Sequence, residues 1–466
     1  MHEVSLSGLA MREHRQLVGL SQAKLAELTG VPQHMLSAFE LGKSSLPAAM
    51  ADKLVSALAR SPDVAALSAR RKRYAQHTYS DVSVLPDRAA RALGTDRNAR
   101  YVAELDAMAS AHASVERAGL NAVSLFAGCG GFSLGFSAAG FGLKGFVELD
   151  SNLRRIYRAN FCHSAEIGAD IAAISDSTIR QHAQAFGDID AIIGGPPCQG
   201  FSLAGKREIN DPRNGLFRHY LRFVDVMRPK VALLENVRLL TSMKGADGML
   251  VKDQIAAEFR RHGYRVAFFE INATSYGIPQ HRERVIFVAT RADLAIEPSI
   301  PAATHGASTD LFSNVMAPTT FADACSDLAY LESGGRSADA LHSAVRHPDH
   351  VVRWLWNVAQ GRSAHENEDA ALRPPSGYNT TYKRQVWMEP ASTVQTTFGM
   401  ISGCRNVHPI ATRSLTVREA ARIQSFPDQF QFPGALGPVR TGIGNAVPPL
   451  LALALGRHVR KVIQSL

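Results

Sequence analysis

Residues 119–290 carry the pattern that most restricts the fold. Short apolar runs rich in β-branched residues alternate there with helical stretches and with loops of glycine and proline. This rhythm is typical of a parallel sheet with helices on both faces, because parallel strands need long crossover connections. Sites in such sheets form beyond the carboxyl ends of the strands. The loops that follow the apolar runs are therefore the first places to look for function.

The rest of the chain divides around this α/β segment. The 466 residues, 45% apolar and 20% charged, have ordinary globular composition with enough apolar material for more than one domain. No run of about 18 apolar residues predicts a membrane-spanning helix, and the N-terminus does not resemble a signal peptide, so we expect a cytoplasmic protein without a membrane partner. The segments we predict are a helical domain (1–60), a linker and helix (61–118, the helix near 98–117), the α/β domain (119–290), an irregular region (291–405) and a helical return (406–466).

The cysteine content and the charge narrow the class further. The five cysteines lie at 129, 162, 198, 325 and 404, and no two form a C-x-x-C pair. This spacing indicates neither a disulfide framework nor a zinc ribbon, so we expect reduced thiols and no metal. The net charge of +9 favours a polyanionic partner without identifying it.

The N-terminal segment predicts two short helices. Ser21 is a good N-cap for a helix over 22–29, Gly30 and Val31 make a turn, and Pro32 begins a second helix that reaches about Glu40. The apolar positions expected to pack these helices together are Leu25, Leu28, Val31, Leu36 and Phe39.

The segment LSQAKLAELTGVPQHMLSAFELGK resembles the helix-turn-helix of lambda-repressor-like regulators. The resemblance implies that the second helix enters the major groove of DNA, with Gln33, His34 and Ser37 as the side chains that contact bases. The alternative is a small helical bundle used for dimerisation or docking.

A glycine-rich loop follows the first apolar run of the α/β segment. Gly128, Gly130 and Gly131 let the backbone turn tightly and approach a ligand. Glu148 ends the next strand, 22 residues beyond Phe126, close to where a dinucleotide fold places its ribose-binding acid. We expect a nucleoside ligand. NAD fits poorly, because the loop lacks the G-x-G-x-x-G form.

The sequence DAIIGGPPCQGFS places a cysteine in a rigid loop. A lone cysteine is usually a small buried hydrophobe. Here, however, Gly194, Gly195 and Gly200 bracket Pro196–Pro197 directly before Cys198, and such a loop packs a core poorly. We therefore expect the loop to present the Cys198 thiol to a ligand.

Taken together, the motifs resemble those of bacterial DNA (cytosine-5)-methyltransferases. The resemblance covers about 121–289 and 414–466, and its motifs follow in the family's order: LFAGCGGFSLGF, GGPPCQGFS, LLENV, QHRERVIFVA, LTVREAARIQSFPD and GNAVPP. It implies a Rossmann-like S-adenosylmethionine-dependent methyltransferase sheet with a smaller target-recognition lobe at 291–405. The segment 406–466 then returns to the catalytic domain, and its helix of LTVREAARIQ braces the two parts.

The resemblance also implies roles for individual residues. Cys198 is the nucleophile, Glu235 contacts N3 of the cytosine, and Arg282 and Arg284 anchor the base, the thiol loop or a phosphate. Gln199 and Ser202 contact DNA around a target base that is flipped out of the duplex. The residues expected to hold S-adenosylmethionine are Phe126, Gly128, Gly130, Gly131, Glu148, Asp170, Pro196, Asn445 and Val447.

Two positions depart from the family pattern, and both concern the cofactor site. Ser124 stands where aspartate is common, and Gly442 where glutamine is common, which puts cofactor affinity in doubt more than activity. In the variable region, aromatic and basic side chains that suit DNA contact, or else form a modest core, are Trp354, Trp356, Tyr378, Tyr382, Lys383, Arg384, Trp387 and Arg405.

The sequence therefore predicts an enzyme that methylates double-stranded DNA within a restriction-modification system. We expect it to be a monomer in catalysis that can dimerise through the N-terminal domain. That domain would bind the protein's own promoter, and a restriction endonuclease would be the functional partner. A fragment beginning near Ala118 would then keep its methylation specificity. The alternatives are a transcriptional regulator with a vestigial methyltransferase domain and an RNA cytosine-5 methyltransferase.

Overall fold

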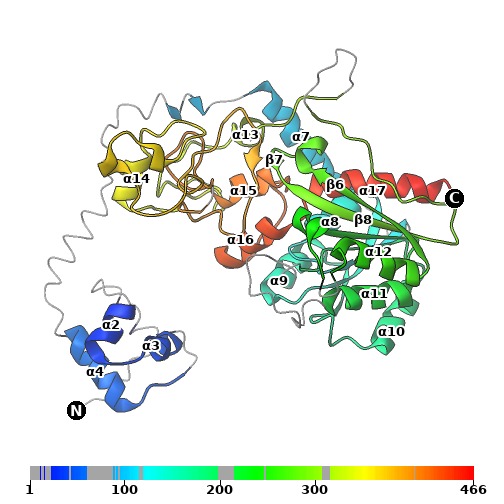
Figure 1. Ribbon diagram of the computed structural model, residues 1–466, viewed down its shortest axis with the longest axis horizontal. Coiled ribbons are helices and arrows are strands. Elements are labelled where there is room, and N and C mark those ends of the chain that lie inside the picture. The colour runs from blue at the N-terminus through cyan, green and yellow to red at the C-terminus, as the bar shows by residue number, and fades with distance from the viewer. Residues whose placement is uncertain are drawn as a thin grey trace. The chain divides into compact units, whose positions relative to one another are not determined.

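The chain forms two compact units, Met1–Asp81 and Val82–Leu466 (Figure 1). Each is considered by itself. The computed structural model describes residues 22–40, 44–59, 95–114, 119–197, 215–245, 248–306, 315–403 and 405–466, together with Met11, Arg15, 88–89 and 91–92. Among these residues, no helix combines the length and the apolar character that crossing a membrane requires.

The first unit contains helices α2 (Gln22–Thr29), α3 (Gln33–Glu40) and α4 (Ala48–Ala59). The first two match the predicted bounds, while the predicted cap Ser21 lies outside the described residues. The prediction for Leu28 is wrong: its side chain is 57% exposed, because it lies on the outer face of α2. The buried core of this unit contains Met11, Leu25, Val31, Leu36 and Leu54.

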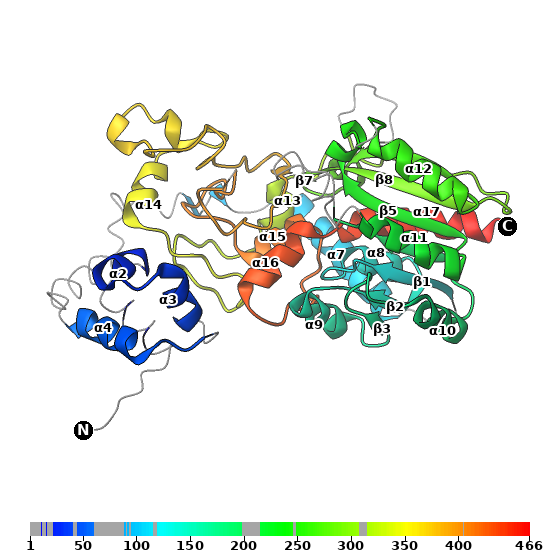
Figure 2. The ribbon, with the colours of Figure 1, turned by 60° about the horizontal axis from the view of Figure 1, so that its bottom comes forward.

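The second unit is built on a seven-stranded sheet, which confirms the predicted α/β class (Figure 2). The strand order is β3-β2-β1-β4-β5-β8-β6. The pairs from β3 to β5 are parallel, and β8 runs antiparallel between β5 and β6. The strands are β1 (Leu120–Leu125), β2 (Phe141–Val147), β3 (Ala165–Gly168), β4 (Ala191–Gly194), β5 (Val231–Val237), β6 (Tyr264–Asn272) and β8 (Glu283–Arg291).

Both faces of the sheet are buried, which explains why its strands read as continuous apolar runs. On β4, Ile193 belongs to one hydrophobic cluster and Ile192 to the other. The first cluster includes side chains of α7 (Asp96–Ala113), α8 (Gly131–Ala138) and α17 (Pro449–Gln464). The second includes side chains of α10 (Asp176–Phe186), α11 (Leu216–Met227) and α12 (Val251–Arg261).

Helix α7 is the helix predicted near 98–117, and it is part of the second unit. Tyr101, Leu105 and Met108 on one of its faces are buried in the first cluster. A cut near Ala118 would remove these side chains from the core. The structure therefore argues against an independent fragment from Ala118, because the second compact unit begins at Val82.

The variable region contains little regular structure, as its sequence indicated. Its elements are α13 (Phe321–Cys325), α14 (Asp349–Leu355), β9 (Ala391–Ser392) and the short 3-10 helices η5 (Ala364–Glu366) and η6 (Ala370–Leu372). Trp356, Trp387 and Arg384 are buried here. The Arg384 guanidinium donates to the backbone carbonyls of five residues, from Leu355 to Ala411. These three side chains are therefore not available at the surface for DNA contact, whereas Tyr378 is 80% exposed.

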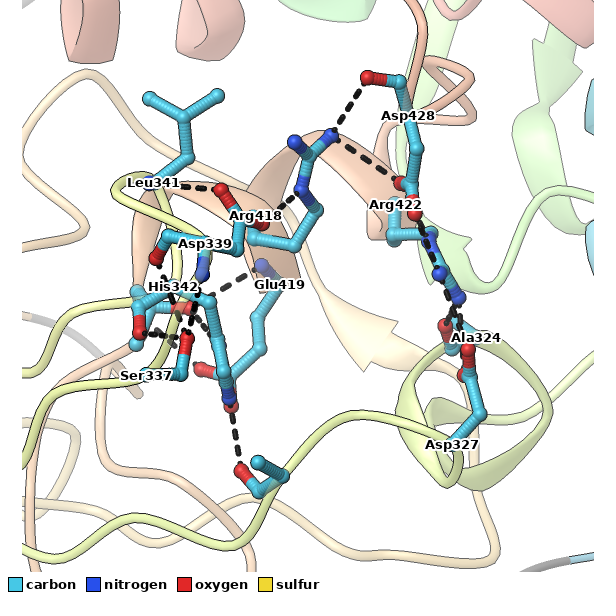
Figure 3. Close-up of polar contacts among 12 residues, drawn as sticks. Ala324, Asp327, Ser337, Asp339, Leu341, His342, Arg418, Glu419, Arg422 and Asp428 are labelled. Carbon is cyan, nitrogen blue, oxygen red and sulfur yellow. Dashed lines mark hydrogen bonds and ion pairs between the residues drawn. The ribbon is translucent and has the colours of Figure 1, made fainter.

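Helix α15 (Val417–Ile423), from the LTVREAARIQ motif, connects the variable region to the rest of the unit (Figure 3). Arg418 pairs with Asp339 at 2.6 Å, and Arg422 bridges Asp327 and Asp428. All three partners come from outside the helix, and two of them come from the variable region. The helix therefore has the bracing position that the sequence predicted. The remaining elements are α9 (Ser151–Asn160), η3 (Arg238–Ser242), η4 (Ala273–Tyr276), β7 (Gln280–His281) and α16 (Leu436–Asn445).

Candidate active site

The ends of β4 and β5 bring the start of the thiol loop against the LLENV motif. Gly194 pairs with Leu234 across the two strands. A Cβ added at Gly195 would lie 2.9 Å from a Glu235 carboxylate oxygen, so a larger residue there would displace the Glu235 side chain. The Asn236 side chain donates to the Pro196 carbonyl at 2.9 Å. Asn236 was not singled out from the sequence, although it belongs to the same motif.

The described part of this loop ends at Pro197. Cys198, Gln199 and Ser202, the expected nucleophile and DNA contacts, lie outside the described residues. The contacts of Gly195 and Pro196 therefore give the position of the loop at its entry, two residues before Cys198.

Glu235 and Arg284 form an ion pair inside this site. The Arg284 Nε atom lies 2.7 Å from Glu235 Oε1, and both side chains are largely buried. The pairing is possible because β8 lies beside β5, with Arg284 opposite Val237. An ion pair of this kind fixes the orientation of the carboxyl group without occupying its second oxygen.

Arg282 has a different position from Arg284. Its side chain is 1% exposed and donates to the carbonyls of Gly444 at 3.0 Å and Ala446 at 2.9 Å. Burial, together with the nearby Arg284 charge, lowers the pKa of Arg282 well below its usual value. Arg282 thus holds the GNAVPP segment. The neighbouring Gln280 reinforces this by donating to the Gln424 side chain at 2.6 Å.

The glycine-rich loop after β1 has backbone angles that suit glycine. Gly128 and Gly130 have φ angles of 58° and 102°. Phe126, half-buried at the end of β1, shares the positive φ region at 53°. A Cβ at Gly131 would lie 2.3 Å from the Val447 carbonyl oxygen, so the GNAVPP segment packs directly on this loop. The return of the C-terminal segment to the loop agrees with the prediction.

Glu148 closes the loop from the end of β2. Its carboxylate accepts hydrogen bonds from the Gly128 and Asp150 backbone N–H groups, both at 2.8 Å. Burial raises the pKa of Glu148 despite these two bonds. The side chain of Leu149 beside it is 69% exposed, an unusual position for a leucine. Asp170 and Asn445 are exposed, and Asp170 accepts from the Ala172 N–H at 2.9 Å.

These surroundings fit a nucleoside with a charged tail. A Cβ at Gly128 would meet nothing within 4 Å, so the loop backbone faces open space. The Glu148 carboxylate borders this loop, which suits ribose hydroxyls, and the exposed apolar side chain of the next residue, Leu149, suits a flat base. The residues therefore fit S-adenosylmethionine.

Helix α3 of the first unit, the helix expected to contact DNA, presents part of its predicted surface. Gln33 and His34 on α3 are exposed, and Ser37 is partly exposed. At the other end of α3, the Glu40 carboxylate accepts from Arg15 Nε at 2.6 Å and from Gln22 Nε2 at 2.8 Å. The sequence did not predict this buried cluster, which fixes α3 against α2.

A twisted sheet with this strand order, a glycine-rich loop after β1 and an acid after β2 is the framework of methyltransferases that use S-adenosylmethionine. The chain belongs to the C-5 cytosine-specific DNA methylase family, whose family model matches residues 120–461. A helix-turn-helix family model matches residues 11–64.

Individual relatives agree with this assignment. The chain is 34% identical to the type II methyltransferase M.DdeI of Desulfomicrobium norvegicum, over 73% of this chain and 88% of that relative. It is 35% identical to the type II methyltransferase M1.HphI of Haemophilus parahaemolyticus, over 74% of this chain and 87% of that relative. A putative DNA modification methyltransferase from an E. coli prophage shares the fold, with a TM-score of 0.59 and 23% identity over 74% of this chain and 99% of that one.

The protein is therefore a DNA (cytosine-5) methyltransferase of the restriction-modification type that uses S-adenosylmethionine and acts on DNA. These matches favour DNA over RNA as the substrate. They also argue against a regulator with a vestigial methyltransferase domain.

Proposed function

We propose that this enzyme methylates a cytosine that has been flipped out of duplex DNA, through a covalent adduct between Cys198 and C6 of the base. The observation that carries the proposal is the buried Glu235–Arg284 pair, packed against the entry of the Cys198 loop. A carboxyl group held beside a nucleophile loop is suited to the polar edge of a bound base. The ring atoms of a paired cytosine are inaccessible in a duplex, so the base must leave the stack.

The residues have complementary tasks in this chemistry. Addition of the Cys198 thiolate to C6 forms an S–C bond and moves the electron pair of the C5–C6 double bond onto C5. Glu235, held by Arg284, delivers a proton or a hydrogen bond at N3 as negative charge develops there. S-adenosylmethionine, when bound, supplies the electrophilic methyl group that C5 attacks. A base then removes the C5 proton, and the Cys198 thiolate leaves to restore the aromatic ring.

The cofactor is assigned to the loop described above. Glu148 would accept hydrogen bonds from the ribose hydroxyls, Phe126 would stack on the adenine, and Asp170 would accept from its amino group. Three further parts of the chain complete the proposed cofactor site. They are the backbone of the glycine loop at Gly128, Gly130 and Gly131, the residue Pro196, and the GNAVPP segment with Asn445 and Val447. Arg282 contributes through its hold on that segment.

DNA contacts are assigned to three parts of the chain. Gln199 and Ser202 contact the duplex where the base has left, residues 291–405 read the target sequence, and residues 1–60 bind a separate operator. The exposed positions of Gln33 and His34 on α3 support the operator role. The simplest operator is the protein's own promoter, with repression as the result. A cognate restriction endonuclease and dimerisation through the first unit complete the proposal.

Trapping with 5-fluorocytosine tests the adduct. Fluorine at C5 cannot leave as a proton does, so target DNA carrying it should stay covalently bound to the enzyme in the presence of S-adenosylmethionine. The complex should survive denaturing electrophoresis, and Cys198→Ala should abolish it while cofactor binding is retained. The adduct mechanism would be wrong if ordinary target DNA were methylated under conditions in which the fluorinated DNA was not trapped.

A further inference from the structure

Part of the stretch between the two family matches is built into the catalytic unit. The matches end at residue 64 and resume at residue 120. Between them, Tyr101, Leu105 and Met108 lie four and three residues apart on one face of α7, and all are at least 96% buried. A mere connection between domains would not need such a face.

Arg88 joins the start of this stretch to the variable region. Its guanidinium carbon lies 3.8 Å from the centre of the Trp356 ring. The guanidinium edge donates to Thr412 Oγ1 at 2.9 Å, pairs with Glu332 at 3.2 Å and donates to the Trp356 carbonyl. Its side chain is 12% exposed. A planar guanidinium can stack and donate along its edge at once, which a lysine ammonium cannot do.

The next contacts continue along α13 and reach α15. Thr95 donates to the Asp323 carboxylate at 2.8 Å. The Asn98 side chain donates to the Asp323 carbonyl and to Asp327 Oδ1, both at 2.9 Å. Asp327 is also the partner of Arg422 on α15 (Figure 3). This part of the stretch is therefore bonded to the variable region through charged and amide groups.

The other end of the stretch contacts helices α15, α8 and α9. The Tyr101 hydroxyl donates to the Arg422 carbonyl at 2.6 Å. His112 lies 2.7 Å from the Ser137 hydroxyl on α8 and 3.1 Å from the Asn160 carbonyl at the end of α9. In both ribbon views α7 lies between α13 and α8 (Figures 1 and 2).

We propose that residues 88–89, 91–92 and 95–114, together the brace, set the position of the variable region relative to the catalytic sheet, and that Arg88 is a positioning residue for DNA recognition. The inference rests on the proposed role of residues 291–405 in reading the target. The variable region has few regular elements of its own, and these links add polar contacts to the apolar packing of Phe321 and Trp387 in the first hydrophobic cluster. A variable region that is displaced from the sheet would make poorer contacts with the target DNA, while the catalytic residues on the sheet would keep their positions.

Steady-state kinetics of Arg88 variants test the brace. Arg88→Ala should raise the KM for target DNA by about tenfold, the effect of weakening about one base contact, and reduce discrimination against sites with one mismatched base pair. S-adenosylmethionine binding and kcat at saturating DNA should stay near the native values, because the cofactor loop and Glu235 are untouched. Arg88→Lys keeps the charge but loses the stacking, so its KM for target DNA should lie between those of the native enzyme and Arg88→Ala. Arg91→Ala, an exposed arginine of the same stretch, is the matched control and should behave as the native enzyme.

Two outcomes would overturn the inference. One is an unchanged KM for DNA and unchanged discrimination in a folded Arg88→Ala enzyme. The other is a parallel fall of kcat, cofactor binding and melting temperature, which would indicate a structural role alone. Tyr378→Ala, at an exposed position of the variable region, separates this inference from the proposed reading role. If it weakens target preference while Arg88→Ala does not, the reading role stands and the brace fails.

Discussion

At the scale of single residues, the carboxyl group of Glu235 is the most informative. It is 9% exposed and pairs with Arg284 at 2.7 Å. Glu235→Gln preserves the shape and the hydrogen bond but cannot deliver a proton. Single-turnover methylation should therefore slow by about 100- to 10,000-fold, the usual contribution of a general acid. Glu283→Gln is the matched control, because Glu283 is an exposed acid at the start of the neighbouring strand β8 and pairs with Arg238.

A near-native rate for Glu235→Gln would assign the N3 contact to another group. S-adenosylmethionine binding should be unchanged in both variants, since Glu148 and the glycine loop are separate from β5. A loss of cofactor binding in Glu235→Gln would instead indicate a disturbed fold around Gly195.

The motifs predicted which residues belong to the site more reliably than they predicted what each residue does there. The sequence indicated Glu148 and Glu235 as functional acids, and both lie beside the loops expected for them. It could not separate Arg282 from Arg284, which lie two positions apart. The chain leaves β7 and enters β8 at this point, so Arg282 turns toward the GNAVPP carbonyls while Arg284 pairs with Glu235. Such a break between two strands has no sequence signal.

The departures from the family pattern have a local explanation at one position. A Cβ at Gly442 would lie 2.9 Å from a Leu153 methyl carbon and 3.0 Å from the Cys129 Cβ. The side chains of Leu153 and Cys129 thus fill the space that a larger residue at position 442 would need. Burial raises the pKa of the Cys129 thiol to about 12, so this cysteine remains a neutral packing group. Pairwise compensation of this kind cannot be recognised from one sequence.

At the scale of elements, α15 depends on a buried cluster around Glu419. Arg413 donates twice to Glu419, at 2.8 and 2.7 Å, and Glu419 also caps the start of the helix. His408 Nδ1 accepts the N–H groups of Ile410 and Ala411, which leaves no room for a proton on that atom. Burial and the Arg413 charge lower the pKa of His408 well below its usual value.

The second unit should therefore lose stability on mild acidification. A histidine with a depressed folded pKa binds its proton first in the unfolded state, so its contribution is complete above about pH 6.5 and falls as the pH drops below that value. His408 alone contributes a slope of up to about 1.4 kcal/mol per pH unit. Denaturant unfolding followed by tryptophan fluorescence measures it, because the chain's three tryptophans, 354, 356 and 387, all lie in the second unit.

His408→Asn removes the titrating group and retains an acceptor for the two N–H groups. Between about pH 5 and 6.5, the free energy of unfolding of this variant should change less steeply with pH than that of the native chain. The difference should be up to about 1.4 kcal/mol per pH unit, which corresponds to one proton. His281→Asn, at an exposed histidine on β7, is the control. An undiminished slope in His408→Asn would exclude His408 as the source of acid sensitivity.

At the scale of the whole molecule, the two units should separate near residue 82 and not near residue 118. A chain beginning at Val82 retains the brace and should methylate the native target with native specificity. A chain beginning at Ala118 loses Tyr101, Leu105 and Met108 from the core. Each side chain contributes about 1.5–3 kcal/mol by burial, and their sum is comparable with the total stability of a typical domain. Melting curves and methylation assays on both fragments should show a folded, active first fragment and an unstable second one.

Fold class and domain order could be predicted because periodicity and motif order are local properties of the sequence. The role of α7 could not, because its buried face shows only the ordinary spacing of an amphipathic helix. Nothing in that spacing tells which surface covers it, and the polar contacts of Asn98 and Arg88 join positions more than 200 residues apart. Contacts this distant arise from the tertiary fold alone.

The proposed division of labour between the units leads to a last prediction, on operator binding. Gln33 and Ser37 lie one helical turn apart on α3, and the Arg15–Glu40 pair fixes that helix from its other end. Gln33→Ala combined with Ser37→Ala should weaken binding to the DNA upstream of the protein's own coding sequence, since each lost base contact costs about 1–3 kcal/mol. Methylation should be unchanged, because target reading is assigned to residues 291–405.

Lys53→Gln, at an exposed position on α4, is the control for a general loss of charge or fold. Gel-shift and methylation assays on the same preparations decide the matter. If the double variant or the fragment from Val82 methylates different sites, the helix-turn-helix takes part in target recognition and the two units do not act separately.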